Sequence, residues 1–147
     1  MSRLELFCIF INILSVDIFH TCSGDVGAAA PYSSPYIPTE CYSGDATEFP
    51  SNNLFAAAGD GIWNNGAACG RQYLVRCISA PEPLSCAMTD AIQVKIVDYA
   101  NSAVSQPVVT PGTTMLLSNN AYDMLVNSSS STSLSDTSII NIEFQQV

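Results

Sequence analysis

The sequence predicts a mainly β fold, in which about six short strands form a small closed barrel with one or two short helices. Two observations carry this prediction. Segments with strand character are spread along the whole chain, and only two helical turns lie between them. Such dispersal favours a barrel over a layered α/β fold. The 147 residues show no internal repeat and are enough for one domain of ordinary size.

The predicted strands are recognised by the alternation of polar and apolar residues. The strongest is 91–98, because it alternates, is rich in β-branched residues and ends on the carboxylate of Asp98. The other predicted strands are 26–32, 72–76, 114–117 and 139–144.

Two further segments predict helical turns. The small apolar run 54–58 ends at Gly59, a residue type that commonly stops helices. Ser118 can cap a second helix over 119–126. The intervening turns and loops are predicted at 41–53, 59–61, 64–66, 78–87, 99–112 and 127–135, which are rich in Gly, Pro, Ser and Asn.

Residues 1–24 have the pattern of a secretory signal peptide. Arg3 precedes the apolar run 6–16, and small residues follow it, so we expect cleavage near Gly24 and a mature domain of residues 25–147. The apolar run is too short to span a bilayer, and no later stretch is long enough, so we expect no membrane insertion.

The predicted mature chain is strongly acidic. Removing residues 1–24 takes out Arg3, Glu5 and Asp17, which leaves three basic and eleven acidic residues and a net charge of −8. Such a chain has almost no cations to neutralise phosphates, so nucleic acid is excluded as a partner. Anionic lipid surfaces should repel it as well.

Four cysteines remain in the predicted mature chain: Cys41, Cys69, Cys77 and Cys86. An even number in a small secreted chain argues for two disulfides, for which three pairings are possible. A zinc site is the alternative, but the spacings match no zinc-knuckle pattern and the single His lies in the predicted signal. We therefore expect no metal and no cofactor.

Asp98, at the end of a strand, is the best candidate for a functional carboxylate. A glycosidase-like site needs a second acid, but no spacing links Asp98 to Asp90, Asp123 or Glu143. The alternative is that Asp98 accepts backbone N–H bonds in a loop. No His remains to activate a serine, which argues against nucleophilic catalysis.

Aromatic residues offer a second candidate site. Tyr32, Tyr42, Trp63 and Tyr73 could form a stacking platform for sugar rings, although Trp63 and Tyr73 are also typical core residues. Asn127 begins an Asn-Ser-Ser sequon and is a candidate for N-glycosylation.

Several motifs taken together resemble the secreted plant natriuretic-peptide-like proteins. These single-domain relatives of expansin domain 1 include the blight-associated protein. The motifs, in order, are CYSG, AAAGDGIWNNGAACGRQYLVRCIS, VKIVDYA, TTMLLSNNAY and INIEF. The resemblance covers essentially the whole predicted mature chain. It implies a six-stranded double-psi β-barrel and the pairings Cys41–Cys69 and Cys77–Cys86.

The resemblance also implies where a ligand groove would lie. Expansins build theirs around a Thr–Tyr pair, an acid that ends the KIVD-like strand, and a later Asp. In this sequence Tyr32 and Asp98 match two of these positions, whereas Ala30 replaces the Thr and Leu116 replaces the later Asp. A leucine cannot transfer a proton, so we expect no lytic activity. The second, carbohydrate-binding domain of expansins has no counterpart here.

The implied function is that of a monomeric, non-enzymatic protein of the apoplast. Natriuretic-type relatives are mobile signals that affect water and ion balance and stress responses, and their active stretch corresponds to residues 41–77. One hypothesis is therefore a signal with a plasma-membrane receptor. The other is a module that binds cell-wall polysaccharide through Tyr32 and Asp98. A defence or inhibitor protein of barwin type is a third and weaker possibility.

Overall fold

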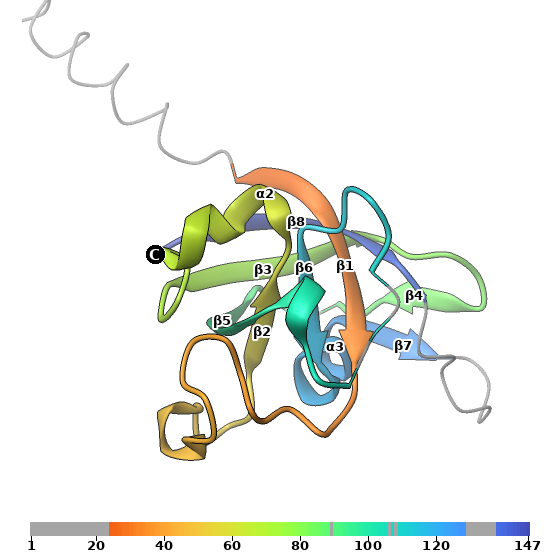
Figure 1. Ribbon diagram of the computed structural model, residues 1–147. Helices are drawn as coiled ribbons and strands as arrows, with labels where there is room; N and C mark the ends of the chain where they lie inside the picture. Colours follow the sequence, from red (N-terminus) through yellow and green to blue (C-terminus); the bar gives the residue numbers. More distant parts are fainter. Residues whose placement is uncertain (1–23, 89, 106, 108, 129–137) are drawn as a thin grey trace, which may run out of the picture.

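The computed structural model describes residues 24–147 except 89, 106, 108 and 129–137, so the predicted signal peptide lies outside the described residues apart from Gly24. Six strands close into a barrel with the order β1-β6-β2-β5-β3-β8 (Figure 1). The mainly β fold class is therefore confirmed. The barrel strands are β1 (Asp25–Tyr32), β2 (Phe55–Ala58), β3 (Gln72–Ser79), β5 (Ile92–Tyr99), β6 (Met115–Ser118) and β8 (Ile140–Gln146).

Parallel and antiparallel pairs are mixed around the barrel. β1 pairs with β6, and β2 with β5, in parallel, while the other neighbours are antiparallel. A two-stranded sheet of β4 (Leu84–Cys86) and β7 (Val126–Ser128) lies beside the barrel. The helical elements are short: η1 (Ala46–Glu48), α2 (Asp60–Trp63), η2 (Asn64–Gly66), η3 (Ala100–Ser102) and α3 (Asn119–Leu125).

Four predictions of local structure are wrong in whole or in part. The run 54–58 is not a helical turn but contains β2, because a run of alanines has no periodicity that distinguishes the two. The glycines at 59–61 belong to the start of α2. Parts of two predicted loops are the strands β4 and β7, which stabilise each other by pairing. The helix after Ser118 is confirmed, and the Ser118 hydroxyl accepts a hydrogen bond from Ala121 N (3.3 Å).

The core has two parts, because successive side chains of a strand point to opposite faces. One part fills the barrel and includes Tyr73, Val75, Ile96, Met115 and Phe144. The other, which we call the outer cluster, lies on the outer face of the four neighbouring strands β1, β6, β2 and β5. Its members are Ala30, Tyr32, Phe55, Ala57, Val97, Ala100, Ala103 and Leu116, with the partly buried Tyr36, Tyr42, Phe49 and Val109.

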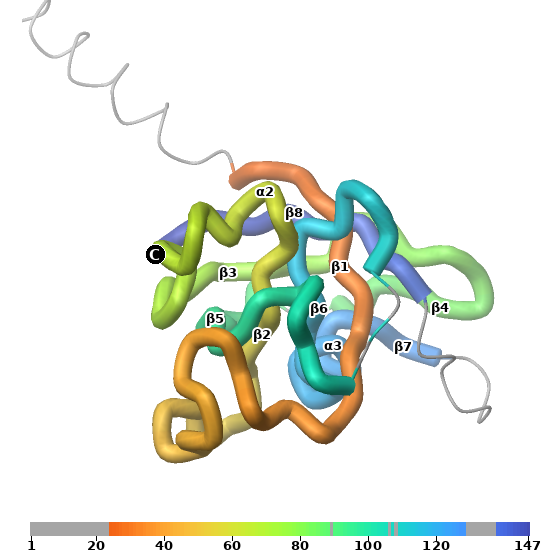
Figure 2. Tube along the Cα trace, in the orientation of Figure 1, coloured from red at the N-terminus to blue at the C-terminus, as the bar shows by residue number. Residues whose placement is uncertain are grey.

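Two segments cover the outer cluster. The chain between β1 and β2 (orange) wraps around one end of the barrel, and the chain after β5 passes in front of β6 and β1 (Figure 2). Both predicted disulfides, Cys41–Cys69 and Cys77–Cys86, are present. The first ties the covering segment to the turn before β3. None of the helices in the described ranges, the longest of which is the seven-residue α3, could span a bilayer.

Candidate functional site

Three of the four positions singled out by the resemblance lie in one row on the outer face of the barrel, and the fourth, Tyr32, belongs to the same outer cluster. Ala30 of β1 is the register partner of Leu116 in β6, which is in turn the partner of Ala57 in β2. Ala57 pairs with Asp98 of β5. The row therefore holds three apolar side chains and one carboxylate.

A β-bulge places Asp98 in this row. Ala56 pairs with Ile96, but the next residue, Ala57, pairs with Asp98, so Val97 is the extra residue in β5. Such a bulge changes the face to which the following side chain points. Without it, Asp98 would point into the barrel, where its carboxylate would find only apolar neighbours.

Asp98 is buried, with 1% of its surface exposed. Its Oδ1 accepts hydrogen bonds from Glu40 N and Tyr99 N, both at 2.8 Å. Burial raises the pKa of Asp98, and the nearby Glu40 charge adds to this, although the two backbone hydrogen bonds oppose it. The predicted alternative, an acid that accepts backbone N–H bonds in a loop, thus describes the Oδ1 oxygen.

Tyr32 lies near Asp98 and is buried as well, with 2% of its surface exposed. Its ring packs edge-on against Tyr36 (centroids 5.0 Å apart) and Phe55 (6.3 Å). Burial, and then the charge of Asp98, raise the pKa of Tyr32 well above its ordinary value. Among the described residues, Tyr32 Oη and Asp98 Oδ2 are buried atoms without a hydrogen-bond partner in the protein.

The segment 33–49 closes the row from one side. Glu40 is anchored by its backbone N–H on Asp98, and its Oε2 accepts a bond from Ser102 Oγ (3.3 Å). The Tyr36 hydroxyl donates a hydrogen bond to the backbone oxygen of Tyr32 (3.3 Å). The positions at which the resemblance implies a groove are thus covered by the protein's own segment 33–49.

This arrangement cannot support two-acid catalysis at the row. Hydrolysis of a glycosidic bond requires one group that gives a proton and a second that acts as base or nucleophile. Leu116, the position at which the resemblance implies a second acid, is a fully buried leucine, and Ala30 supplies no hydroxyl. Glu40, which sequence reasoning missed, meets Asp98 through its backbone rather than through its carboxylate.

The other predicted site residues lie away from the row. Tyr73 is inside the barrel with 4% of its surface exposed, and its ring lies 6.0 Å from Phe144. Trp63 is half-buried and stacks on Tyr99, with centroids 4.7 Å apart. The four aromatic residues therefore do not form one platform. Asn127 is exposed on β7, and its glycosylation stays a prediction.

A second polar cluster was not predicted, because its members come from separate segments. Asp60 Oδ1 accepts hydrogen bonds from Tyr99 Oη (2.5 Å) and from Asn101 Nδ2 (2.8 Å). Asn101 Nδ2 also lies 3.0 Å from Tyr99 Oη. The only indication of this cluster in the sequence is that Tyr99 directly follows Asp98 at the end of the strongest predicted strand.

Comparison with known proteins gives two relatives that match most of the chain. The chain is 32% identical over 125 residues to an EG45-like domain containing protein of Citrus jambhiri, a match that covers 82% of this chain and 79% of the relative. It is 30% identical over 123 residues to the putative EG45-like domain containing protein 1 of Arabidopsis thaliana, which covers 81% and 86%. No protein-family model matches the chain.

Among solved structures, the chain is similar to an expansin of Clavibacter michiganensis. A mutant of that protein in complex with cellohexaose matches with a TM-score of 0.54 at 18% identity. The apo form matches with a TM-score of 0.53 at 17% identity. The match covers 83% of this chain but only 49% of the expansin, so this chain spans about half of its length. The shared fold is the double-psi β-barrel that the resemblance implied.

Proposed function

Because the chain belongs to the family of EG45-like domain containing proteins and shares the fold of expansin domain 1, we propose that it is an extracellular signal without lytic activity. In this proposal it acts on water and ion balance and on stress responses, as natriuretic-peptide-like relatives do. The surface of residues 41–77 would be presented to a partner in the plasma membrane.

The observation that carries the proposal is the row Ala30–Leu116–Ala57–Asp98. The position that the resemblance assigns to the catalytic acid holds a leucine, and Glu40, directly before the 41–77 surface, lies over the remaining acid. A face that is filled in this way no longer supports chemistry on a polymer. Asp98 instead anchors the chain at Glu40, directly before the 41–77 segment, on the barrel.

The test is the volume of isolated plant protoplasts after addition of the oxidised chain from Asp25 onward. We expect a saturable change in volume. Arg71→Ala, within the proposed surface, should weaken the response, and Asp123→Ala, on α3 outside it, should not. A well-folded chain without any effect over a wide concentration range would contradict the proposal.

A second candidate function is the binding of cell-wall glucan without cleavage. Two observations favour it: an expansin with the same fold was solved with cellohexaose, and Tyr32 Oη and Asp98 Oδ2 are buried without a partner in the protein. Buried polar atoms of this kind gain most from a ligand hydroxyl. For a glucan to reach them, the segment around Tyr36 and Glu40 would have to move.

Co-sedimentation with insoluble cellulose and other wall fractions tests this candidate. Tyr32→Phe removes only the hydroxyl, and Asp98→Asn keeps the Oδ1 acceptor, so both variants should fold yet bind less. Tyr73→Phe, inside the barrel, is the matched control. Binding that survives both outer-face changes would place the glucan elsewhere, and a lack of binding to every fraction would remove this candidate.

A further inference from the structure

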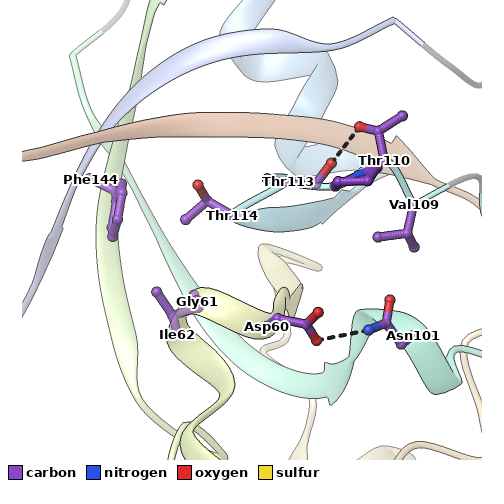
Figure 3. A pocket seen from close by; sticks show the side chains of 11 residues that line it. Asp60, Gly61, Ile62, Asn101, Val109, Thr110, Thr113, Thr114 and Phe144 are labelled. Carbon is purple, nitrogen blue, oxygen red and sulfur yellow. Dashed lines mark hydrogen bonds between the residues drawn. The ribbon is translucent and has the colours of Figure 1, made fainter.

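A cleft of about 400 Å³ lies at the end of the barrel where β2 passes into α2. One wall is formed by Asp60, Gly61 and Ile62 with Asn101, and the other by the segment 109–114. Figure 3 shows Phe144 at one end of the cleft and Val109 at the other. Asp60, Gly61 and Ile62 of the first wall belong to the 41–77 surface, whereas Asn101 follows β5, and no member of the row with Asp98 lines this cleft.

The two walls are fixed relative to each other. Gly59 N donates a hydrogen bond to Thr114 O (2.9 Å) at the point where the walls meet. A Cβ on Gly59 would lie 2.1 Å from Thr113 O, so no other residue fits there without a shift of the backbone. On the second wall, the hydroxyls of Thr110 and Thr113 form a hydrogen bond with each other (2.9 Å). The cleft is therefore a preformed part of the structure.

Asp60 gives the cleft its chemical character. Both of its hydrogen bonds, from Tyr99 Oη and Asn101 Nδ2, go to Oδ1. These bonds hold the carboxylate in position, and Figure 3 shows the one from Asn101. No described residue donates a hydrogen bond to Oδ2. The cleft thus presents an oriented anionic acceptor.

The remaining lining is apolar or neutral. Ile62, Val109 and Phe144 supply apolar surface, and none of the residues that line the cleft is basic. A negative charge next to apolar walls matches a side chain with a cationic end and an aliphatic stem, which is the chemistry of Arg and Lys. The predicted mature charge of −8 would attract such a group over a longer range.

We propose that this cleft receives an arginine or lysine side chain of a protein partner, with the cationic group on Asp60 and its stem between Ile62 and Val109. The inference rests on the proposed function only in that it describes a partner for the 41–77 surface. Its binding test stands independently of any cellular response.

The only Trp of the chain provides the readout. Trp63 stacks on Tyr99 (ring centroids 4.7 Å apart, ring planes at 18°), and the Tyr99 hydroxyl donates a hydrogen bond to Asp60. A cation on Asp60 should therefore change Trp63 fluorescence. The probe is N-acetyl-arginine amide, and N-acetyl-citrulline amide is its neutral counterpart of the same shape.

We expect a saturable fluorescence change with the arginine probe and none with the citrulline probe. Asp60→Asn keeps the Oδ1 acceptor for Tyr99 and Asn101 but removes the charge, so it should weaken binding about tenfold. Asp123→Asn, an exposed acid on α3, should leave binding unchanged. Thermal unfolding of both variants checks that they are folded.

Several outcomes would overturn the proposal: no saturable change, equal binding of the citrulline probe, or binding that Asp60→Asn leaves intact. If cellohexaose gave the same response and lost it in Asp60→Asn, the cleft would belong to a neutral sugar. In the protoplast assay, a full response from Asp60→Asn would contradict the proposal that the partner binds through this cleft, and it would leave the proposed function standing. A lack of response from the unaltered chain would refute the proposed function alone.

Discussion

At the level of single residues, the outer face of the barrel holds one carboxylate in an apolar setting. Ala30 and Leu116 remove the polar groups that would share its charge, and a tyrosine hydroxyl remains nearby. Within the described part of the chain, no basic side chain forms an ion pair with Asp98, and its charge is stabilised by the two backbone N–H groups on Oδ1. This balance determines how the stability depends on pH.

The first prediction concerns Asp98. Because burial raises its pKa in the folded protein above the ordinary 3.8, the folded state keeps a proton that the unfolded chain has already released. The stabilisation from this group is therefore fully present below pH 3.8 and is lost as the pH rises through the folded pKa. Asp98→Asn cannot ionise and keeps Oδ1, so its stability relative to the unaltered chain should increase with pH.

Urea unfolding from about pH 3.5 to 7 measures this effect, because the range begins just below the ordinary aspartate pKa of 3.8. Asp123→Asn is the control, because its carboxylate is exposed on α3. A difference in unfolding free energy between Asp98→Asn and the unaltered chain that stayed constant across this range would contradict the prediction.

The second prediction concerns Gly59, where the end of β2 approaches the segment before β6. A Cβ there would meet Thr113 O at 2.1 Å and Thr114 O at 2.9 Å, and both are backbone atoms that cannot rotate away. Gly59→Ala should therefore lower the free energy of unfolding by about 1–3 kcal/mol. Gly61→Ala, where nothing lies within 4 Å of the added Cβ, should be neutral or slightly stabilising. Equal effects at the two glycines would show that the approach relaxes without cost.

At the level of elements, the strands with a clear alternation could be predicted from the sequence. β5 and β8 are the best examples, since their inward positions are aliphatic or aromatic and their outward positions mostly polar. β2 could not be predicted, because Ala56, Ala57 and Ala58 are all fully buried and carry no alternating pattern. Its strand form depends on pairing with β5 and β6, which are distant in the sequence.

The candidate site was predictable only in part, for a similar reason. The resemblance indicated Tyr32, Ala30, Asp98 and Leu116. In the structure Tyr32, Ala30 and Leu116 belong to the outer cluster, and Asp98 lies beside them at the end of the row. The segment that covers them could not be foreseen, because Glu40 reaches Asp98 through a backbone N–H, which has no sequence signature.

The third prediction compares the two disulfides. Cys41–Cys69 spans 28 residues and joins the covering segment to the turn before β3, whereas Cys77–Cys86 spans 9 and joins β3 to β4. A cross-link over a longer loop restricts the unfolded chain more. Replacing the first pair by serine should therefore cost about 1 kcal/mol more than replacing the second. Guanidinium unfolding of the two double-serine variants tests this order, and a reversed order would contradict the loop-length argument.

At the level of the whole molecule, barrel closure makes distant parts of the chain depend on one another. β1 lies between β6 and β8, so the first and last strands of the domain are neighbours. The 41–77 surface has the same dependence. Its strand β2 pairs with β5 and β6, and its strand β3 pairs with β5 and β8. β2 and β3 are not neighbours in the barrel.

The fourth prediction follows for a peptide of residues 41–77. The peptide keeps the Cys41–Cys69 disulfide but lacks Cys86 and every strand that pairs with β2 or β3. Unpaired strands leave their backbone groups and apolar faces in water, so the oxidised peptide should be largely unfolded by circular dichroism. If the surface acts through a fixed shape, the peptide should also be far weaker than the whole domain in the protoplast assay. Equal potency of the two would show instead that a short linear segment carries the signal and that the barrel serves only as its carrier.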